Sequence, residues 1–269
     1  MSEKTKLFVA VTGAYGGMGK AAVKALKDKG FFVFALDKNV GEKEENVLPI
    51  EADITNENSV RRAFELMCTM TDELYAVIHF AGIYMLDSLV EMESTDFERI
   101  FKINLGGVYL INKAFFPLLK KGSRIVITTS ELAPLDPLPF TGIYAVTKSA
   151  LDKYAYSLRM ELQLKEISVS VLRAGAVATG MLDVSTDALD RFCKKTERYS
   201  CNAERFKRIV GSVEARSIPP FTIAKKVLQI LGKRSPRFAY AINRNPLLLM
   251  LNALPKCLQL WVIKQVLKN

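Results

Sequence analysis

The sequence predicts an α/β fold: a single doubly wound parallel sheet with helices on both faces. Apolar, β-branched runs alternate with helical patterns through the first two-thirds of the chain, as they do in repeated strand–helix–strand units. The apolar runs are continuous, which is typical of parallel strands buried on both faces. A glycine cluster joins the first run to the first helical pattern, at a position where such sheets bind ligands.

The expected strands are six apolar runs in the first two-thirds of the chain and a seventh near the C-terminus. They cover residues 7–13, 31–37, 47–53, 75–82, 123–130, 168–175 and 237–242. Helical patterns lie between them at residues 20–29, 59–71, 96–119 and 144–164. Because neither a repeat nor a linker interrupts this alternation, residues 1–269 are expected to form one domain.

The pattern changes after residue 180. Residues 181–215 are polar and helical, and we expect them to form a lid over the substrate. Residues 244–269 predict two short apolar helices that divide at Pro255, as a helical C-terminal extension. Residues 191–269 carry 17 Lys and Arg against 3 Asp and Glu, whereas residues 1–190 carry 21 against 25. The net charge of +10 therefore belongs to the C-terminal part.

Composition argues against several classes of protein. The chain has no apolar run long enough for a transmembrane helix and begins without a secretory signal, so a cytoplasmic location is expected. Its four cysteines form no CxxC pair, which argues against a disulfide framework or a metal site. The single histidine, His79, excludes a multi-histidine metal site, and we expect it to be packed and hydrogen-bonded.

The glycine cluster is Thr12 to Gly19, TGAYGGMG, and it predicts a dinucleotide site. Glycines at this turn allow a pyrophosphate to approach the backbone at a helix N-terminus. Asp37 follows about 20 residues later, where a carboxylate binds the adenosine ribose and repels the 2′-phosphate of NADP. NAD is therefore favoured over NADP, although Lys38 could reduce that preference. Asp53 is expected either to contact the adenine or to cap the next helix.

Two Tyr-x-x-x-Lys motifs occur, Tyr144 to Lys148 and Tyr109 to Lys113. This composition makes one such match common by chance, so the spacing alone decides nothing. Ser130 ends an expected strand 14 residues before Tyr144, at the sheet edge that holds ligands. No serine at a strand end precedes Tyr109. We therefore interpret the first motif as a proton-transfer pair and the second as part of a packing or subunit-contact helix.

These motifs together resemble the short-chain dehydrogenase/reductase family over residues 7–180. The family's glycine motif matches Thr12, Gly13, Gly17 and Gly19, and its Tyr-x-x-x-Lys matches Tyr144 and Lys148. The resemblance implies a Rossmann fold, NAD(P) as cofactor, and the catalytic residues Asn104, Ser130, Tyr144 and Lys148. The cofactor contacts that it implies are Thr12, Gly13, Tyr15, Gly17, Met18, Gly19, Asp37, Asp53, Ile54, Ala81, Gly82, Tyr144, Lys148, Gly175, Val177 and Thr179.

The resemblance also implies a role for each catalytic residue. Tyr144 is the general acid–base, with its pKa lowered by the ammonium of Lys148 and by the positive nicotinamide ring. Lys148 holds the nicotinamide ribose, Ser130 binds the substrate oxygen, and Asn104 holds a water that relays protons to Lys148. The chain departs from the family at Phe80, where an asparagine usually steadies the turn, and at Ala174, where a proline is usual.

The apolar loop before Tyr144 favours a lipophilic substrate, with Leu132 and Phe140 as candidate contacts. The C-terminal segment is similar to the ends of steroid- and retinoid-oxidising members, so a hydroxysteroid is favoured, with a retinoid or fatty-acyl compound as the alternative. A non-catalytic dinucleotide-binding module acting on a membrane or a partner is the hypothesis from another class.

The expected partners are a second copy, in a homodimer or homotetramer, and no nucleic acid. The helices of residues 244–269 are expected to rest on an anionic membrane, to cover the substrate pocket or to pack against another subunit.

Overall fold

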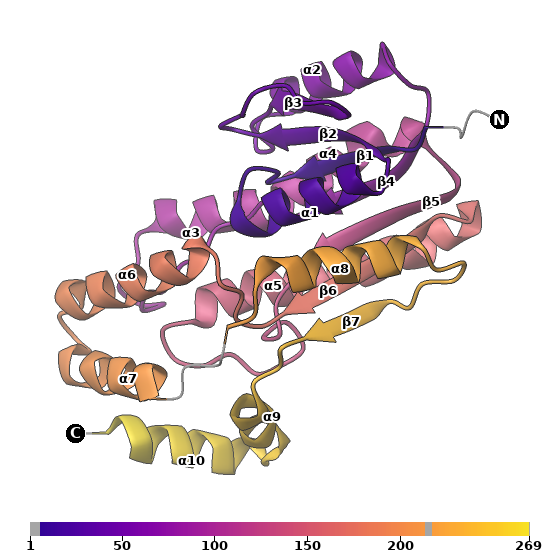
Figure 1. The fold of residues 1–269 in the computed structure, drawn as a ribbon. Coiled ribbons are helices and arrows are strands. Elements are labelled where there is room, and N and C mark those ends of the chain that lie inside the picture. The colour runs from indigo at the N-terminus through magenta and orange to yellow at the C-terminus, as the bar shows by residue number, and fades with distance from the viewer. Residues whose placement is uncertain (1–5, 213–216, 269) are drawn as a thin grey trace.

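The computed structural model describes residues 6–212 and 217–268 and is built around one sheet of seven parallel strands (Figure 1). The strands follow the order β3-β2-β1-β4-β5-β6-β7. The order reverses between β1 and β4, so a crevice is expected beyond the carboxyl ends of these two strands. The strands are β1 (Phe8–Thr12), β2 (Phe32–Asp37), β3 (Val47–Glu51), β4 (Leu74–His79), β5 (Leu119–Thr128), β6 (Ser168–Ala174) and β7 (Ala239–Ile242).

Helices cover both faces of the sheet, and each face has its own core. Residues of α2 (Glu57–Cys68), α4 (Gly107–Phe115) and α5 (Gly142–Leu162) fill one core. Residues of α1 (Gly17–Asp28) and α8 (Pro220–Leu231) fill the other, and these two helices lie together in front of the sheet in Figure 1. The predicted doubly wound sheet is therefore confirmed, and its strands are buried on both faces because their residues are continuously apolar.

The strand predictions are confirmed in place, with one difference at β5. The helical pattern of residues 96–119 predicts a single helix, and the structure shows several segments instead. They are α3 (Ser94–Phe101), a π-helical segment (Lys102–Gly106), α4 and a 3₁₀ turn (Phe116–Leu118). Since Pro117 lies in that turn, the helix ends there and β5 begins at Leu119. A π segment cannot be seen in apolar periodicity, and such segments often mark functional sites.

The C-terminal part is helical, as the sequence predicts. The lid region contains α6 (Gly180–Lys195) and α7 (Ser200–Ser212), and residues 213–215 of the predicted lid lie outside the described residues. The last helices are α9 (Pro246–Ala253) and α10 (Lys256–Leu267), which divide at Pro255 as expected. In Figure 1 they lie beside α7, at the end of the molecule farthest from α2. None of the helices in the described chain is long and apolar enough to span a bilayer.

Candidate active site

Three side chains, those of Ser130, Tyr144 and Lys148, meet beyond the carboxyl end of β5. Ser130 follows the end of β5, and Tyr144 and Lys148 lie one turn apart in the first turns of α5. The Tyr144 hydroxyl hydrogen-bonds with Ser130, and the Nζ atom of Lys148 lies 5.7 Å from the centroid of the Tyr144 ring. Lys148 Nζ also donates to the carbonyl oxygen of Thr128 at 3.4 Å. The sequence-predicted group is thus brought together in a buried site.

Burial sets the protonation of this group. It raises the pKa of Tyr144 well above its ordinary value, Tyr84 raises it further, and the hydrogen bond with Ser130 lowers it. Burial also lowers the pKa of Lys148 to about 8. In the protein alone, burial therefore dominates the tyrosine pKa. The predicted lowering by Lys148 together with the positive nicotinamide ring stays a prediction. The low-dielectric surroundings disfavour the phenolate, and they disfavour the ammonium that would stabilise it.

Asn104 lies in the π-helical segment and clamps the turn that follows β4. Its Nδ2 atom donates to Ile83 O at 3.0 Å and to Thr147 Oγ1 at 3.2 Å, while its Oδ1 atom accepts from Ile83 N at 2.8 Å. A Cβ atom on Gly82 would lie 3.1 Å from Asn104 Oδ1 and 3.5 Å from Lys148 Nζ. The turn therefore fits tightly against the catalytic lysine, and Asn104 steadies it where Phe80 cannot.

Phe80 supports the same turn from the other side. Its side chain is buried in the core that α1 and α8 cover, and its backbone N–H donates to Thr12 O at 3.0 Å. The turn after β6 is also held by the backbone, since Gly175 N donates to Ile242 O at 2.9 Å. At both departures from the family pattern, Phe80 and Ala174, backbone hydrogen bonds thus fix the turn that follows the strand.

Tyr84 is part of the site, although no motif in the sequence indicates it. Its ring centroid lies 4.8 Å from that of Tyr144, and burial raises its pKa to about 12, so its hydroxyl stays protonated. Ile83, Met85 and Leu132 pack into the same cluster around Tyr144. The only signal that could have found Tyr84 is its place directly after the Ala81-Gly82 turn.

The glycine turn forms a cradle in which Gly13, Gly17 and Gly19 have no room for a side chain. Gly13 has a φ of +66°, and a Cβ atom there would lie 2.5 Å from Ala81 N. A Cβ atom on Gly17 would lie 2.5 Å from Thr179 Cγ2, and one on Gly19 would lie 2.0 Å from Gly13 O. The turn, the strand β4 exit and Thr179 therefore converge at the N-terminus of α1, and the cradle fits a dinucleotide pyrophosphate.

The acidic residues after β2 and β3 have different partners. The Asp37 carboxylate accepts from Tyr15 N at 2.9 Å and from Lys38 N at 2.8 Å, which fixes it beside the glycine turn. Asp53 accepts from Thr55 at 2.9 Å and 2.7 Å and pairs with Lys38 Nζ at 3.1 Å. The residue that caps α2 is Asn56, whose side chain accepts from Ser59 N. Asp53 is therefore not the helix cap.

The remaining predicted cofactor residues lie around this crevice or behind it. Ile54 packs on Gly107 at the start of α4, where a Cβ atom on the glycine would lie 2.4 Å from Ile54 Cδ1. Thr179 caps α6 by accepting from Met181 N at 3.3 Å. Val177 is buried and forms a bridge with Ile218. Met18 lies in the first turn of α1 and packs on the core that α1 and α8 cover.

The two predicted substrate residues occupy different surroundings. Leu132 packs against the cluster that contains Tyr144. Phe140 has a φ of +65°, and its ring lies 4.7 Å from that of Phe192 and 5.5 Å from that of Tyr199. Phe140 thus anchors the lid helices to the loop before α5, and its contact with a substrate stays a prediction.

The second Tyr-x-x-x-Lys motif lies on the outside of α4. Tyr109 is half exposed, and Lys113 Nζ pairs with Glu57 at 3.1 Å. His79 is buried, its Nε2 donates to Asn112 Oδ1 at 2.9 Å, and burial lowers its pKa to about 4. The prediction of a packed, hydrogen-bonded histidine is confirmed. The second motif has both its side chains exposed, and its place in a subunit contact stays a prediction.

The helix that carries the catalytic pair is fixed to the sheet by an ion pair. Arg173 on β6 donates from Nε at 3.0 Å and from Nη2 at 2.7 Å to the carboxylate of Asp152 on α5. Thr129 Oγ1 also donates to that carboxylate at 3.4 Å. The pair joins α5 to β6, Thr129 extends the contact to the residue before Ser130, and sequence spacing does not reveal either contact.

Comparison with known families gives the same result as the geometry. A family model described as short chain dehydrogenase matches residues 7–190. This chain belongs to the short-chain dehydrogenase family. Members act as oxidoreductases on a CH–OH group and bind NAD(P), so this dehydrogenase is an enzyme of that class.

Relatives of the dehydrogenase have named activities. It is 26% identical over 244 residues to a 3-ketodihydrosphingosine reductase of Bacteroides thetaiotaomicron, covering 84% of this chain and 91% of that protein. It is 29% identical over 260 residues to the Mus musculus estradiol 17-beta-dehydrogenase 2, covering 88% and 68%.

Solved structures share the fold of the dehydrogenase. A short chain dehydrogenase from Burkholderia cenocepacia in complex with NADP has a TM-score of 0.72 at 20% identity, covering 98% of each chain. A Brucella melitensis 3-ketoacyl-(acyl-carrier-protein) reductase complexed with NADH has a TM-score of 0.72 at 21% identity, covering 88% of this chain and 96% of that one.

Proposed function

We propose that this dehydrogenase interconverts a secondary alcohol and a ketone on a lipophilic substrate with NAD. The observation that carries the proposal is the Tyr144 hydroxyl, hydrogen-bonded to Ser130 and flanked by Lys148, against an apolar wall. A hydroxysteroid-type compound is the favoured substrate, and a retinoid or fatty-acyl compound is the alternative in the same class.

Each of the three residues has its own role in alcohol oxidation. Tyr144, as phenolate, accepts the hydroxyl proton of the substrate, and Ser130 hydrogen-bonds the substrate oxygen as its charge changes. Lys148 supplies positive charge beside the phenolate. The nicotinamide ring is the hydride acceptor, which is the chemistry that the cofactor contributes. In the reductive direction the same Tyr144 hydroxyl donates its proton to the alkoxide.

Two features support NAD over NADP. The Asp37 carboxylate is held beside the glycine turn, where it would repel a 2′-phosphate. Lys38, the cation that could weaken this effect, is paired with Asp53. A polar cavity of about 500 Å³ next to them contains two cations, Lys38 and Arg62, and two acids, Glu51 and Asp53. Its charges balance, so it offers no excess of positive charge to a phosphate.

The surroundings of Tyr144 support a lipophilic substrate. The cluster around its ring consists of Ile, Met, Phe, Leu and Tyr side chains. The names of two relatives point the same way, because 3-ketodihydrosphingosine and estradiol are both largely apolar molecules.

A substrate panel with a matched pair of variants tests the proposal. Steroids, retinoids and acyl compounds are offered with NAD and with NADP, and turnover is followed at the nicotinamide absorbance. We expect Tyr144→Phe to lower kcat by about 10²–10⁴-fold on the substrate found. The control Tyr109→Phe alters the exposed tyrosine of the second motif and should leave kcat unchanged. Equal turnover by wild type and Tyr144→Phe, or tighter binding of NADPH than of NADH, would contradict the proposal.

A further inference from the structure

Large apolar side chains are exposed together on the two C-terminal helices. On α9, Leu247 is 51% exposed and Met250 68%; on α10, Leu260 is 69% exposed and Trp261 58%. Side chains of this size at consecutive turns of two neighbouring helices form a patch, which is unusual on a monomer surface and marks an interaction site.

The apolar surface continues beyond the helices into a groove of about 580 Å³ beside α10. Ile263 and Leu267 of α10 line it on one side, and Leu89 and Val90 line it on the other. Leu89 and Val90 are themselves exposed. In the sequence, the segment that carries Leu89 and Val90 lies between Tyr84 and Asn104, two residues of the candidate active site.

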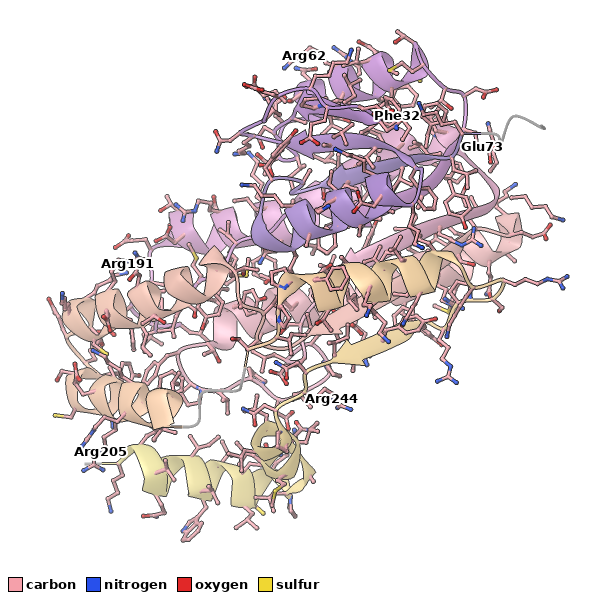
Figure 2. The ribbon with its side chains drawn as sticks, viewed as in Figure 1. Phe32, Arg62, Glu73, Arg191, Arg205 and Arg244 are labelled. Atoms are coloured by element: carbon pink, nitrogen blue, oxygen red, sulfur yellow. The ribbon has the colours of Figure 1, made fainter. Side chains whose placement is uncertain are left out.

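The charges that the C-terminal segment itself carries are all of one sign. From residue 215 to the C-terminus the chain contains no Asp or Glu, and residues 244–268 contain Arg244, Lys256, Lys264 and Lys268. Lys264 and Lys268 are exposed, and neither forms an ion pair with another described residue. Figure 2 shows Arg244 near α9 and Arg205 at the α7 end of the same region. Apolar side chains are therefore interspersed with cations.

Polar bonds fix these two helices to the body of the protein. Asn252 Oδ1 accepts from Asp136 N at 2.8 Å, and Lys256 pairs with the Asp136 carboxylate. Asn202 Nδ2 on α7 donates to Leu267 O at 2.6 Å. The helices are thus held in place by specific contacts with the loop before α5 and with the lid.

We propose that this face, α9 and α10 with the adjoining groove, docks the protein on an anionic lipid bilayer. Trp, Leu and Met side chains would enter the boundary between headgroups and acyl chains, and the lysines would contact the lipid phosphates. A second copy fits less well, because a two-fold contact would place the same cations opposite one another.

Vesicle flotation with the full chain tests the docking. The probe is a vesicle of phosphatidylcholine and phosphatidylserine in equimolar amounts, compared with phosphatidylcholine alone. Trp261 is the only tryptophan, so its emission reports this face directly. We expect flotation with the anionic vesicle, a blue shift of the emission, quenching by brominated acyl chains, and weakening by salt.

Variants locate the binding face. Met250→Ser with Leu260→Ser should reduce vesicle affinity at least about tenfold, and Lys264→Gln or Lys268→Gln about fivefold each. Leu164→Ser is the control, because Leu164 is 80% exposed on a different element, and it should bind as wild type. Circular dichroism shows that each variant is folded.

Three outcomes would overturn the proposal. They are a wild-type protein that stays off both vesicles, a bound protein whose Trp261 emission is unchanged, and light scattering that shows a dimer lost only in the Met250→Ser/Leu260→Ser variant. The last outcome would assign the face to a second copy.

Discussion

Lys148 has a catalytic role in the proposed function, in surroundings that oppose its charge. That role would need its ammonium beside Tyr144, yet the group is buried and burial lowers its pKa to about 8. The acceptor of its hydrogen bond, the Thr128 carbonyl oxygen, lies at the limit of such a bond at 3.4 Å. A group kept in such a position lowers stability in exchange for activity, as is common in active sites.

Replacing this lysine should therefore stabilise the fold. The folded pKa lies below the unfolded value of 10.5, so the full cost of the buried charge is present below about pH 8 and vanishes by pH 10.5. We expect Lys148→Met to raise the free energy of unfolding at pH 7 by about 3 kcal/mol at most, and the gain to shrink between pH 8 and 10.5.

Denaturant unfolding of the wild type and of Lys148→Met across this pH range measures the effect. Turnover should be lost in Lys148→Met. The exposed Lys153→Met, on the same helix, is the control and should show neither change. A Lys148→Met variant that is less stable at every pH would show that the lysine is stabilising.

The sequence predicts which side chains meet at the site better than it predicts their surroundings. Ser130, Tyr144 and Lys148 could be selected because one ends an apolar strand and the other two lie one helical turn apart, and their catalytic roles stay a prediction. Tyr84 lies beside Tyr144 only because of how the segment after β4 folds, and that depends on contacts far apart in the chain. The direction of the Tyr144 pKa shift likewise depends on burial, which a motif does not contain.

The helical elements around the site are joined by side chains that satisfy backbone groups. The π-helical segment places Asn104 opposite the turn after β4, where it serves both the N–H and the C=O of Ile83. Residues 94–118 thus form several kinds of helix, and the π-helical segment, whose turn is wider than that of an α-helix, is the part that contacts the site.

Removing this clamp should loosen one turn. Asn104→Ala leaves the Ile83 N–H and C=O without their partner, which should lower the free energy of unfolding by about 1–3 kcal/mol. Hydrogen exchange at Ile83 should rise together with the fall in stability. Asn104→Asp keeps an acceptor for the Ile83 N–H and should protect that amide better than alanine does. Unchanged exchange at Ile83 in Asn104→Ala would contradict the clamp.

The ion pair between α5 and β6 gives a second prediction for an element. Asp152→Ala leaves the Arg173 guanidinium, which is only 23% exposed, without its carboxylate. The free energy of unfolding should therefore fall by about 2–4 kcal/mol. Turnover should fall as well, because the pair holds the helix that carries Tyr144. Thermal unfolding and kcat measure the two effects.

The single variant Arg173→Met and the double variant Asp152→Ala/Arg173→Met complete the cycle for the ion pair. The double variant removes both charges and should recover part of the stability, giving a non-zero interaction energy in the cycle. Additive losses in the two single variants would show that the side chains act independently.

Elements are predictable where local pattern decides them. Buried strands and Pro-divided helices follow from apolar runs and proline, so β1 to β7 and the α9–α10 division agree with expectation. The π segment and the extension of β5 back to Leu119 do not follow, because both depend on the tertiary partners of a continuous apolar stretch.

At the scale of the molecule, one buried acid connects the active site to the C-terminal helices. Glu131 follows Ser130, is 9% exposed, and accepts from Asn245 N at 2.6 Å through Oε2. Its Oε1 atom lies against Gly175, where a Cβ atom would come within 3.0 Å. Burial raises the pKa of this carboxyl, and Arg244 opposes the rise. The proposed docking face is therefore fixed to the end of β5.

Removing that acceptor should free the C-terminal helices without disturbing the cofactor site. In Glu131→Ala the Asn245 amide at the start of α9 loses its hydrogen-bond acceptor. The equilibrium constant for local opening of this helix should therefore rise about tenfold. We expect faster hydrogen exchange throughout α9 and α10, a higher KM for the lipophilic substrate and unchanged NAD affinity. Glu131→Gln keeps an acceptor oxygen and should restore both exchange and KM. If Glu131→Ala alters NAD affinity while α9 and α10 exchange as before, the residue acts at the cofactor site and does not tether the C-terminal helices.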